Sequence, residues 1–289
     1  MRITTVGYGA ERHIAVARSE TQWQLCPEPG DLGAALERGA VPGPQPHWPL
    51  VDAAELELLA PIPAPRRNVI CLGLNYAEHA AESQRAKGAE WALPSDLVVF
   101  TKATTTVTGP YAEITLDPAV TEQLDWEVEL AAVIGRGGRH IPAERAAEHV
   151  FGYTVVNDLS ARDLQFRHKQ FFLGKSVDGT CPMGPWITTA DAVPDPHALT
   201  LSCRVNDVLK QHACTSGMIA TVPQIVAGLS RVLTLEPGDI IATGTPSGVG
   251  FARQPPEYLA PGDRVTSEVE GLGRLENRLV SPPDDERQP

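Results

Sequence analysis

Two glutamates, two residues apart, are the first chemically suggestive feature of this 289-residue chain. Glu127 and Glu129 lie in LDWEVELAAVIG (124–135), which has the pattern of a strand running into an apolar stretch. Because successive side chains of a strand point to opposite faces, both carboxylates share one face and Trp126 and Val128 the other. The spacing alone also fits a solvated strand face. In the interior, however, adjacent carboxylates repel each other unless a cation or proton lies between them.

A third carboxylate, Asp158, ends the next apolar strand pattern, GYTVVND (152–158). Three converging carboxylates would form the all-oxygen site that Mg²⁺ or Mn²⁺ prefers, with coordination positions left for water and substrate. The spacing does not itself bring the three together, so this metal site depends on the family resemblance described below.

Other segments carry groups suited to acid–base and anion chemistry. His79 and Glu82 are three residues apart in NYAEHAAE, on one face of a predicted helix. A carboxylate raises the basicity of a neighbouring imidazole and fixes its tautomer, which suits a water-activating base, although an incidental surface pair has the same spacing. Lys175, at a predicted strand-to-turn position, can pair with an anionic substrate or be solvated. TGTPSGVG (243–250) lacks the Gly-Lys-Ser/Thr element of a phosphate-binding loop and predicts only a tight turn.

The surrounding pattern predicts an α+β chain that is mainly β. Short strand patterns dominate from residue 68 onward without regular alternation with helices, which argues against a doubly wound or (β/α)₈ sheet. Two proline-rich connectors place a soft boundary near residue 62. We therefore expect a small N-terminal domain and linker over 1–62, a core over 63–281, and a disordered polar tail over 282–289.

Two local patterns within the core are specific enough to test against a structure. LSCRVNDVLKQH (201–212) predicts a hairpin with its turn near Asn206 and Asp207. TVPQIVAGLSRVLTL (221–235) predicts an amphipathic helix.

The composition narrows the function classes. Lys plus Arg total 24 and Asp plus Glu total 36, so the net charge of −12 disfavours nucleic-acid binding. No apolar run approaches the length of about 18 residues expected of a membrane span, and the first residues lack a secretory signal pattern. The 5 cysteines are widely spaced and form no Cys-x-x-Cys motif, so we expect no disulfide framework and a cytoplasmic protein.

Six segments together resemble the fumarylacetoacetate hydrolase family, over roughly residues 66–280, and in particular its bacterial acylpyruvate hydrolases and its enzymes that hydrate, isomerise or decarboxylate 2-oxo diacids. The resemblance is specific because all six occur in the family's order: CLGLNYAEHAAE (71–82), FTKATTTVTGP (100–110), LDWEVELAAVIG (124–135), GYTVVNDLSARDLQ (152–165), GKSVDGTCPMGPW (174–186) and LEPGDIIATGTPSGVG (235–250). Ala103 and Gly217 depart from the usual proline and aspartate, and neither is a proposed metal ligand.

The resemblance implies a mixed β-roll core, an Mg²⁺ or Mn²⁺ cofactor, a small-molecule 2-oxo acid substrate and a homodimer. By motif position it implies metal ligands, a water-activating pair, a lysine that binds the substrate carboxylate or oxyanion, and four substrate contacts. These are, in the same order, Glu127, Glu129 and Asp158; His79 and Glu82; Lys175; and Tyr76, Arg162, Gln165 and Thr245.

The reaction that we expect from the resemblance is metal-dependent hydrolysis of a C–C bond in an acylpyruvate or β-diketo acid, through a metal-chelated enolate. Three alternatives use the same site: decarboxylation of a 2-oxo acid, isomerisation or hydration of an unsaturated 2-oxo diacid, and a lyase reaction on a ureido-type acid. A fourth is a metal-binding paralogue without catalysis, since a fold does not guarantee an activity. The intact His79, Glu82 and Lys175 argue against that alternative.

Overall fold

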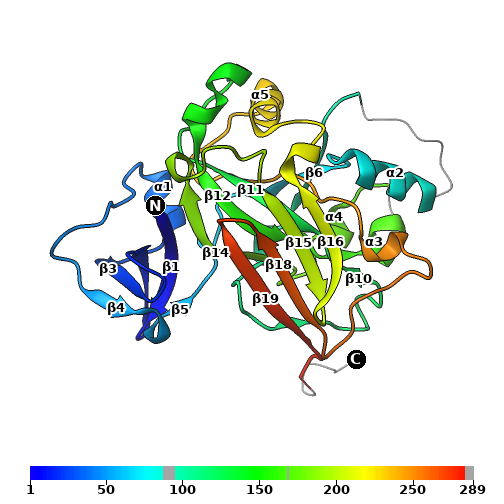
Figure 1. Ribbon diagram of the computed structural model, residues 1–289, viewed down its shortest axis with the longest axis horizontal. Helices are drawn as coiled ribbons and strands as arrows, with labels where there is room; N and C mark the ends of the chain where they lie inside the picture. The colour runs from blue at the N-terminus through cyan, green and yellow to red at the C-terminus, as the bar shows by residue number, and fades with distance from the viewer. Residues whose placement is uncertain (87–94, 168, 284–289) are drawn as a thin grey trace.

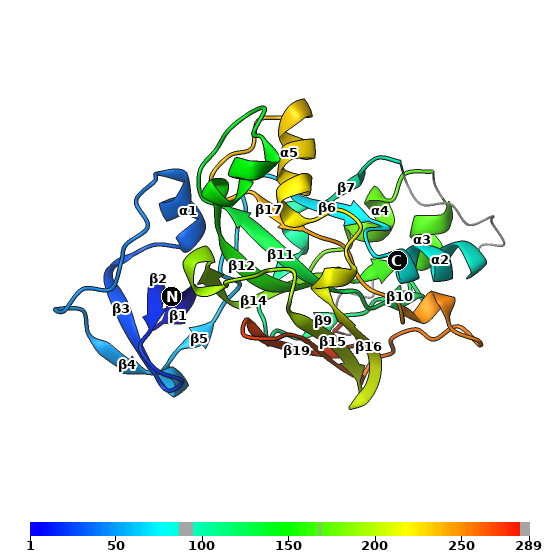
Figure 2. The same cartoon turned by 45° about the horizontal axis from the view of Figure 1, so that its top comes forward.

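The computed structural model describes residues 1–86, 95–167 and 169–283. It is an α+β structure that is mainly β, which confirms the predicted fold class. In both views the N-terminal strands lie at one end of the molecule and helices α2, α3 and α4 gather at the other (Figures 1 and 2). No helix within the described residues is both long enough and apolar enough to cross a membrane. All 5 cysteines are free thiols, as expected.

A 12-stranded sheet forms the framework of the molecule. Its main path runs β4-β3-β2-β1-β14-β12-β11-β17-β6-β7, with β5 paired to β1 and β8 paired to β14. The strands in that order are β4 (Leu50–Asp52), β3 (Gln22–Pro29), β2 (Glu11–Ala17), β1 (Arg2–Tyr8), β14 (Cys181–Thr189), β12 (Val150–Asn157), β11 (Val128–Ile134), β17 (Ile240–Ala242), β6 (Val69–Gly73), β7 (Val98–Lys102), β5 (Glu57–Leu58) and β8 (Val107–Thr108).

Two smaller sheets complete the β structure. A 5-stranded sheet has the order β16-β15-β18-β19-β9, and a 2-stranded one pairs β10 with β13. Their strands are β16 (Val208–Cys214), β15 (Thr200–Val205), β18 (Arg264–Val269), β19 (Gly273–Val280), β9 (Ile114–Thr115), β10 (Leu124–Asp125) and β13 (Ser160–Ala161).

The helices are short and connect or cover the sheets. The α-helices are α1 (Leu32–Glu37), α2 (Ala77–Ala86), α3 (Arg162–Arg167), α4 (Phe172–Lys175) and α5 (Val222–Val232). The 3₁₀ turns are η1 (Ala53–Glu55), η2 (Thr104–Thr106), η3 (Ala143–His149), η4 (Ala190–Ala192), η5 (Thr215–Gly217) and η6 (Gly250–Ala252).

Strand β11 is buried along its whole length because both of its faces are covered. Its Leu130 belongs to an apolar cluster that also contains Ile225 of α5 and Val265 of the 5-stranded sheet. Its Ala131, on the opposite face, belongs to a second cluster with Leu32 of α1. Any charged side chain on β11 is therefore held in the interior, where only a partner of opposite charge or a hydrogen bond makes it tolerable.

Most local predictions are confirmed, with three differences. The hairpin of β15 and β16 turns at Asn206 and Asp207, both with positive φ (49° and 66°), as in a type I′ turn. The pattern PAERAAEHV (142–150) is typical of a short α-helix, but residues 143–149 form the 3₁₀ turn η3. Lys175 ends the short helix α4 instead of lying between a strand and a turn. The third difference, the interruption of the predicted 124–135 strand, belongs with the site.

The N-terminal strands are continuous with the core sheet. β1 pairs with β14, with Ile3 opposite Ile187, and not only with its neighbours β2 and β5. The domain boundary near residue 62 stays a prediction. The predicted disordered tail falls mostly at 284–289, outside the described residues.

Helix α5 supplies a test of local stability. Thr221 caps it, and Thr221 and Gln224 form a reciprocal capping box. We expect Thr221→Ala to lower the free energy of unfolding by about 1 kcal/mol, because the backbone N–H of Gln224 loses its side-chain acceptor. Denaturant unfolding measures this change. Val232→Ala, at the 79% exposed end of the same helix, is the matched control and should change stability by less than about 0.5 kcal/mol. Equal effects of the two variants would contradict the cap's role.

Candidate metal centre and active site

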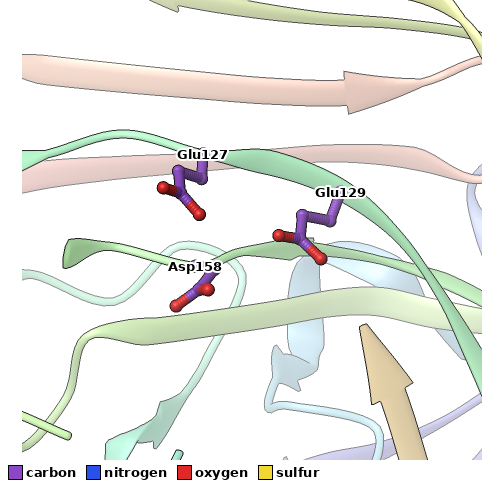
Figure 3. A group of neighbouring side chains, drawn as sticks. All are labelled: Glu127, Glu129 and Asp158. Carbon is purple, nitrogen blue, oxygen red and sulfur yellow. The ribbon is translucent and has the colours of Figure 1, made fainter. Parts of the chain in front are cut away.

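The three predicted metal ligands meet in the interior of the molecule. Glu129 lies in β11, Glu127 just before it, and Asp158 just after β12, which pairs antiparallel with β11. One oxygen of each carboxylate lies within 4.8 Å of the others, and all three side chains are buried. Figure 3 shows Glu127 and Glu129 projecting from one ribbon toward Asp158 on its neighbour. The structure thus brings together side chains that the sequence spacing alone leaves apart.

The predicted strand over 124–135 is interrupted at Trp126 and Glu127, which separate β10 from β11. Side chains take the backbone N–H groups there: Asn157 Oδ1 accepts from Glu127 at 3.0 Å, and Gln211 Oε1 accepts from Val128 at 3.0 Å. The interruption keeps both glutamates on the same side of the chain while allowing their backbone to leave the regular ladder.

Three buried cations surround two of the carboxylates. Lys175 Nζ lies 2.7 Å from both Glu127 Oε2 and Asp158 Oδ2. Lys102 Nζ lies 2.9 Å from Asp158 Oδ1, and Arg162 Nη2 lies 2.6 Å from Glu127 Oε1. Burial acts against the charge of Glu127, but Lys175 and Arg162 outweigh it and hold its pKa far below the usual range. Burial likewise acts against the charge of Lys175, yet Asp158 and Glu127 raise its pKa.

Glu129 differs from the other two carboxylates. Within the described residues no lysine or arginine reaches ion-pairing distance of it, and its carboxylate accepts the N–H of Gly244 at 2.7 Å. Burial, together with the charges of Asp158 and Glu127, raises the pKa of Glu129 well above its usual value.

A divalent cation fits this set of donors. Asp158 Oδ1 is buried and accepts no hydrogen bond from the residues that the structure describes, although Lys102 Nζ lies 2.9 Å away. The carboxylate of Glu129 lacks a cationic partner within the described residues. A hard cation with oxygen ligands would satisfy both, and Glu127, Glu129 and Asp158 are the residues that would hold it.

His79 and Glu82 form the predicted pair on α2. His79 Nδ1 lies 3.0 Å from Glu82 Oε1, and both oxygens of Glu82 accept the N–H of Gly248, at 2.9 and 3.1 Å. Because an ionised carboxylate only accepts hydrogen bonds, the ring proton belongs on Nδ1 and Nε2 keeps its lone pair. Nε2 has Ser83 Oγ at 3.5 Å. The pair therefore presents a base whose tautomer is fixed from behind.

A small cavity connects the histidine with the charged cluster. It has a volume of about 50 Å³. Most of the predicted site residues lie on its wall together with an aromatic lining: His79, Glu127, Arg162, Gln165, Lys175 and Thr245, with Phe100, Phe166, Phe171 and Phe251. A small anionic molecule placed there would meet an acid–base group, a cationic cluster and apolar walls.

Each of the three guanidinium nitrogens of Arg162, predicted as a substrate contact, donates a hydrogen bond to a side chain of the protein. Its Nε donates to Asp125 at 2.8 Å, Nη1 to Gln165 at 2.8 Å and Nη2 to Glu127 at 2.6 Å. Its guanidinium carbon also lies 4.5 Å from the centre of the Phe251 ring. Arg162 therefore orients Glu127 and Gln165, and its direct contact with substrate stays a prediction.

Thr245 and Tyr76, also predicted to be substrate contacts, lie in different surroundings. The Thr245 hydroxyl donates to the carbonyl of Val128 at 2.9 Å and accepts from Gln211 at 2.8 Å. Tyr76 is not on the wall of the His79 cavity. It lines a second cavity of about 400 Å³ with Glu78 and Ser247, and its buried hydroxyl has no hydrogen-bond partner among residues 1–86, 95–167 and 169–283. Their roles as substrate contacts stay predictions.

Three residues of the site were not selected from the sequence. Lys102 ends the strand VVFTK, where a charge after apolar residues was an available signal. Asp125 precedes the Glu-x-Glu motif and accepts the N–H groups of Gly250 and Phe251, at 2.7 and 3.1 Å. Gln211 lies on β16, more than 80 residues from the motif it contacts, and its local sequence carries no such signal.

The scaffold is mainly β, and it buries three carboxylates that could hold a divalent cation near a His–Glu pair. This combination is typical of one class of enzymes. Residues 68–280 match the fumarylacetoacetate (FAA) hydrolase C-terminal family, and the chain belongs to this family. The oxaloacetate tautomerase YisK of Bacillus subtilis is 49% identical over 93% of this chain and 83% of its own length.

Solved structures agree with this assignment. A fumarylacetoacetate hydrolase from psychrophilic Exiguobacterium antarcticum is 40% identical, with a TM-score of 0.87 over 98% of this chain and 100% of its own. A 2-hydroxyhepta-2,4-diene-1,7-dioate isomerase from Mycobacterium marinum is 34% identical, with a TM-score of 0.80 and the same coverage. The relatives thus include enzymes named for tautomerisation and isomerisation as well as for hydrolysis.

The isolated position of Glu129 gives a prediction for metal binding. We expect Mg²⁺ or Mn²⁺ to raise the melting temperature of the wild-type protein, by an amount equivalent to about 2.7 kcal/mol at 100 times the dissociation constant. Glu129→Gln should lose this response, because a charged ligand is gone. The same variant should be at least as stable as the wild type without metal, because its repulsion with Asp158 is removed. Thermal unfolding with metal or with a chelator measures both effects.

Glu268→Gln is the matched control, since it neutralises an exposed carboxylate on β18. It should keep the full response to metal. A wild-type melting temperature that is insensitive to both ions would contradict the metal site.

Proposed function

We propose that this chain is a metal-dependent tautomerase or isomerase of a small 2-oxo dicarboxylic acid, with oxaloacetate as the first substrate to test. The structural observation that carries the proposal is that His79, backed by Glu82, lines the same small cavity as Glu127 and Lys175. The names of the relatives favour this reaction over C–C hydrolysis, the reaction first expected from the sequence.

The chemistry asks for little more than a proton transfer. When an enol becomes a keto acid, the hydroxyl loses a proton and the other carbon of the C=C bond gains one. No water is consumed. A divalent cation on Glu127, Glu129 and Asp158 would polarise the 2-oxo group and stabilise the negative charge of the enolate.

The chain's own groups perform the remaining tasks. His79 Nε2 takes up a proton and returns it, while Glu82 at Nδ1 stabilises the imidazolium that forms in between. Lys175 keeps its positive charge between Glu127 and Asp158 and offsets the charge of a bound anion. The lining of Phe100, Phe171 and Phe251 keeps the cavity apolar, which strengthens these electrostatic interactions.

C–C hydrolysis of an acylpyruvate is the second candidate. The observation in its favour is the same His79–Glu82 pair, which can activate water as readily as it moves a substrate proton. The 40% identity to a structure named as a fumarylacetoacetate hydrolase points the same way. The two reactions differ in whether a water molecule is consumed, so their products separate them.

The homodimer, the cytoplasmic location and the choice between Mg²⁺ and Mn²⁺ stay predictions. They come from the family resemblance and the composition.

A direct test follows the ultraviolet absorbance of enol-oxaloacetate with Mg²⁺, Mn²⁺ or a chelator. We expect metal-dependent loss of the enol without release of pyruvate. His79→Gln should lower kcat roughly 10²- to 10⁴-fold, as expected for the loss of a general base, while metal affinity is unchanged. His47→Gln, which alters an exposed histidine far along the chain from α2, should retain wild-type rates.

Other products would redirect the assignment. Pyruvate and CO₂ from oxaloacetate would indicate a decarboxylase, and pyruvate with a carboxylic acid from acetylpyruvate would support the hydrolase. Full tautomerase activity in His79→Gln would remove His79 from the mechanism.

A further inference from the structure

A closed ring of three hydrogen bonds joins the Glu-x-Glu peptide to the 243–250 loop and to strand β16. The N–H of Val128 donates to Gln211 Oε1 at 3.0 Å, and Gln211 Nε2 donates to Thr245 Oγ1 at 2.8 Å. The Thr245 hydroxyl closes the ring by donating to the carbonyl of Val128 at 2.9 Å. Gln211 Nε2 also donates to the carbonyl of Pro246 at 2.9 Å.

The ring takes over where a strand ends. β17 pairs with β11 only from Ala131 to Val133, and the N–H of Thr243 then donates to the carbonyl of Leu130 at 3.0 Å. Beyond that point no strand of the described chain supplies partners for the N–H and C=O of Val128 on this side, and the side chains of Gln211 and Thr245 supply them instead. Side chains thus continue the hydrogen-bonding pattern of the sheet at Val128, which lies between Glu127 and Glu129.

The ring's members are held tightly. Gln211 is 1% exposed, Thr245 is 3% exposed and Val128 is fully buried. Rotation of the peptide groups on either side of Val128 would leave its buried N–H and C=O without hydrogen-bond partners, which costs about 1–3 kcal/mol for each group. Val128 lies between Glu127 and Glu129, so a fixed backbone at Val128 also fixes the relative position of the two carboxylates.

We propose that Gln211 is a positioning residue for the divalent-cation site. It acts through the Val128 peptide and the Thr245 loop and touches neither metal nor substrate. Gln211 comes from the edge strand of the 5-stranded sheet, whereas the carboxylates lie on or directly beside β11 and β12 of the 12-stranded sheet. The 5-stranded sheet therefore helps to set the geometry of the site. The inference rests on the metal site of the proposed function and not on the reaction assigned to it.

The test is calorimetric titration of metal-free protein with Mn²⁺ or Mg²⁺, which needs no turnover. Gln211→Met keeps the length of the side chain and removes the amide. We expect it to weaken metal binding roughly 10- to 100-fold, the range for residues that orient metal ligands. Thr245→Val opens the same ring from the other side and should also weaken metal binding. The double variant should lose no more than the larger single loss, since either change already breaks the ring.

Asn277→Leu is the matched control for the loss of a buried amide. Asn277 is also 1% exposed and donates to two backbone carbonyls, of Gly109 and Ala112, at 3.2 and 2.9 Å. Its substitution should lower the melting temperature and leave metal affinity unchanged.

The inference is overturned if Gln211→Met and Thr245→Val lose thermal stability as Asn277→Leu does but bind metal like the wild type. Fully additive losses in the double variant would also overturn it, because the ring would then not act as a unit. If Gln211→Met does not fold, the metal affinity of Thr245→Val decides. Metal binding by the wild-type protein without tautomerase activity would contradict the proposed reaction and leave this inference intact, provided that Gln211→Met and Thr245→Val still weaken metal binding.

Discussion

Mutual repulsion between buried carboxylates is the constraint on which the rest of the structure depends. Glu127, Glu129 and Asp158 lie close enough to share one ion, and all three are buried. Lys175, Lys102 and Arg162 offset most of this charge and are themselves buried. Each of these long side chains stands at the end of a secondary-structure element: Lys102 ends β7, Arg162 begins α3 and Lys175 ends α4. The positions of these element ends bring the three cationic side chains to the carboxylates.

Two pairs of candidate site residues could be recognised from the sequence because the members of each pair are close along the chain. Glu127 and Glu129 are related by the period of a strand, and His79 and Glu82 by the turn of a helix, so their relations can be read from spacing. Asp158 joins them only through the pairing of β11 with β12, which spacing does not contain. The family resemblance provided that link.

The supporting residues were less predictable for the same physical reason. Lys102, Asp125 and Gln211 act through contacts between distant segments, and no periodicity marks such contacts. Arg162 was predicted to be a substrate contact, but each of its three guanidinium nitrogens donates to a side chain of the protein: Asp125, Gln165 or Glu127. Residue type thus identified the right neighbourhood, whereas the partner of each side chain depended on the tertiary structure.

The pairing of β1 with β14 has a consequence for how the chain acquires its structure during synthesis. Ile3 and Ile187 lie opposite each other, although nearly the whole first two-thirds of the chain separates them. As the ribosome releases the N-terminus first, β1 and β2 can form their hairpin early, but β1 must wait for its other neighbour. Contacts of such long range close slowly, because the intervening chain loses conformational entropy first. The N-terminal strands therefore join the large sheet only after β11 and β12, the strands on or beside which the three carboxylates lie, have been synthesised.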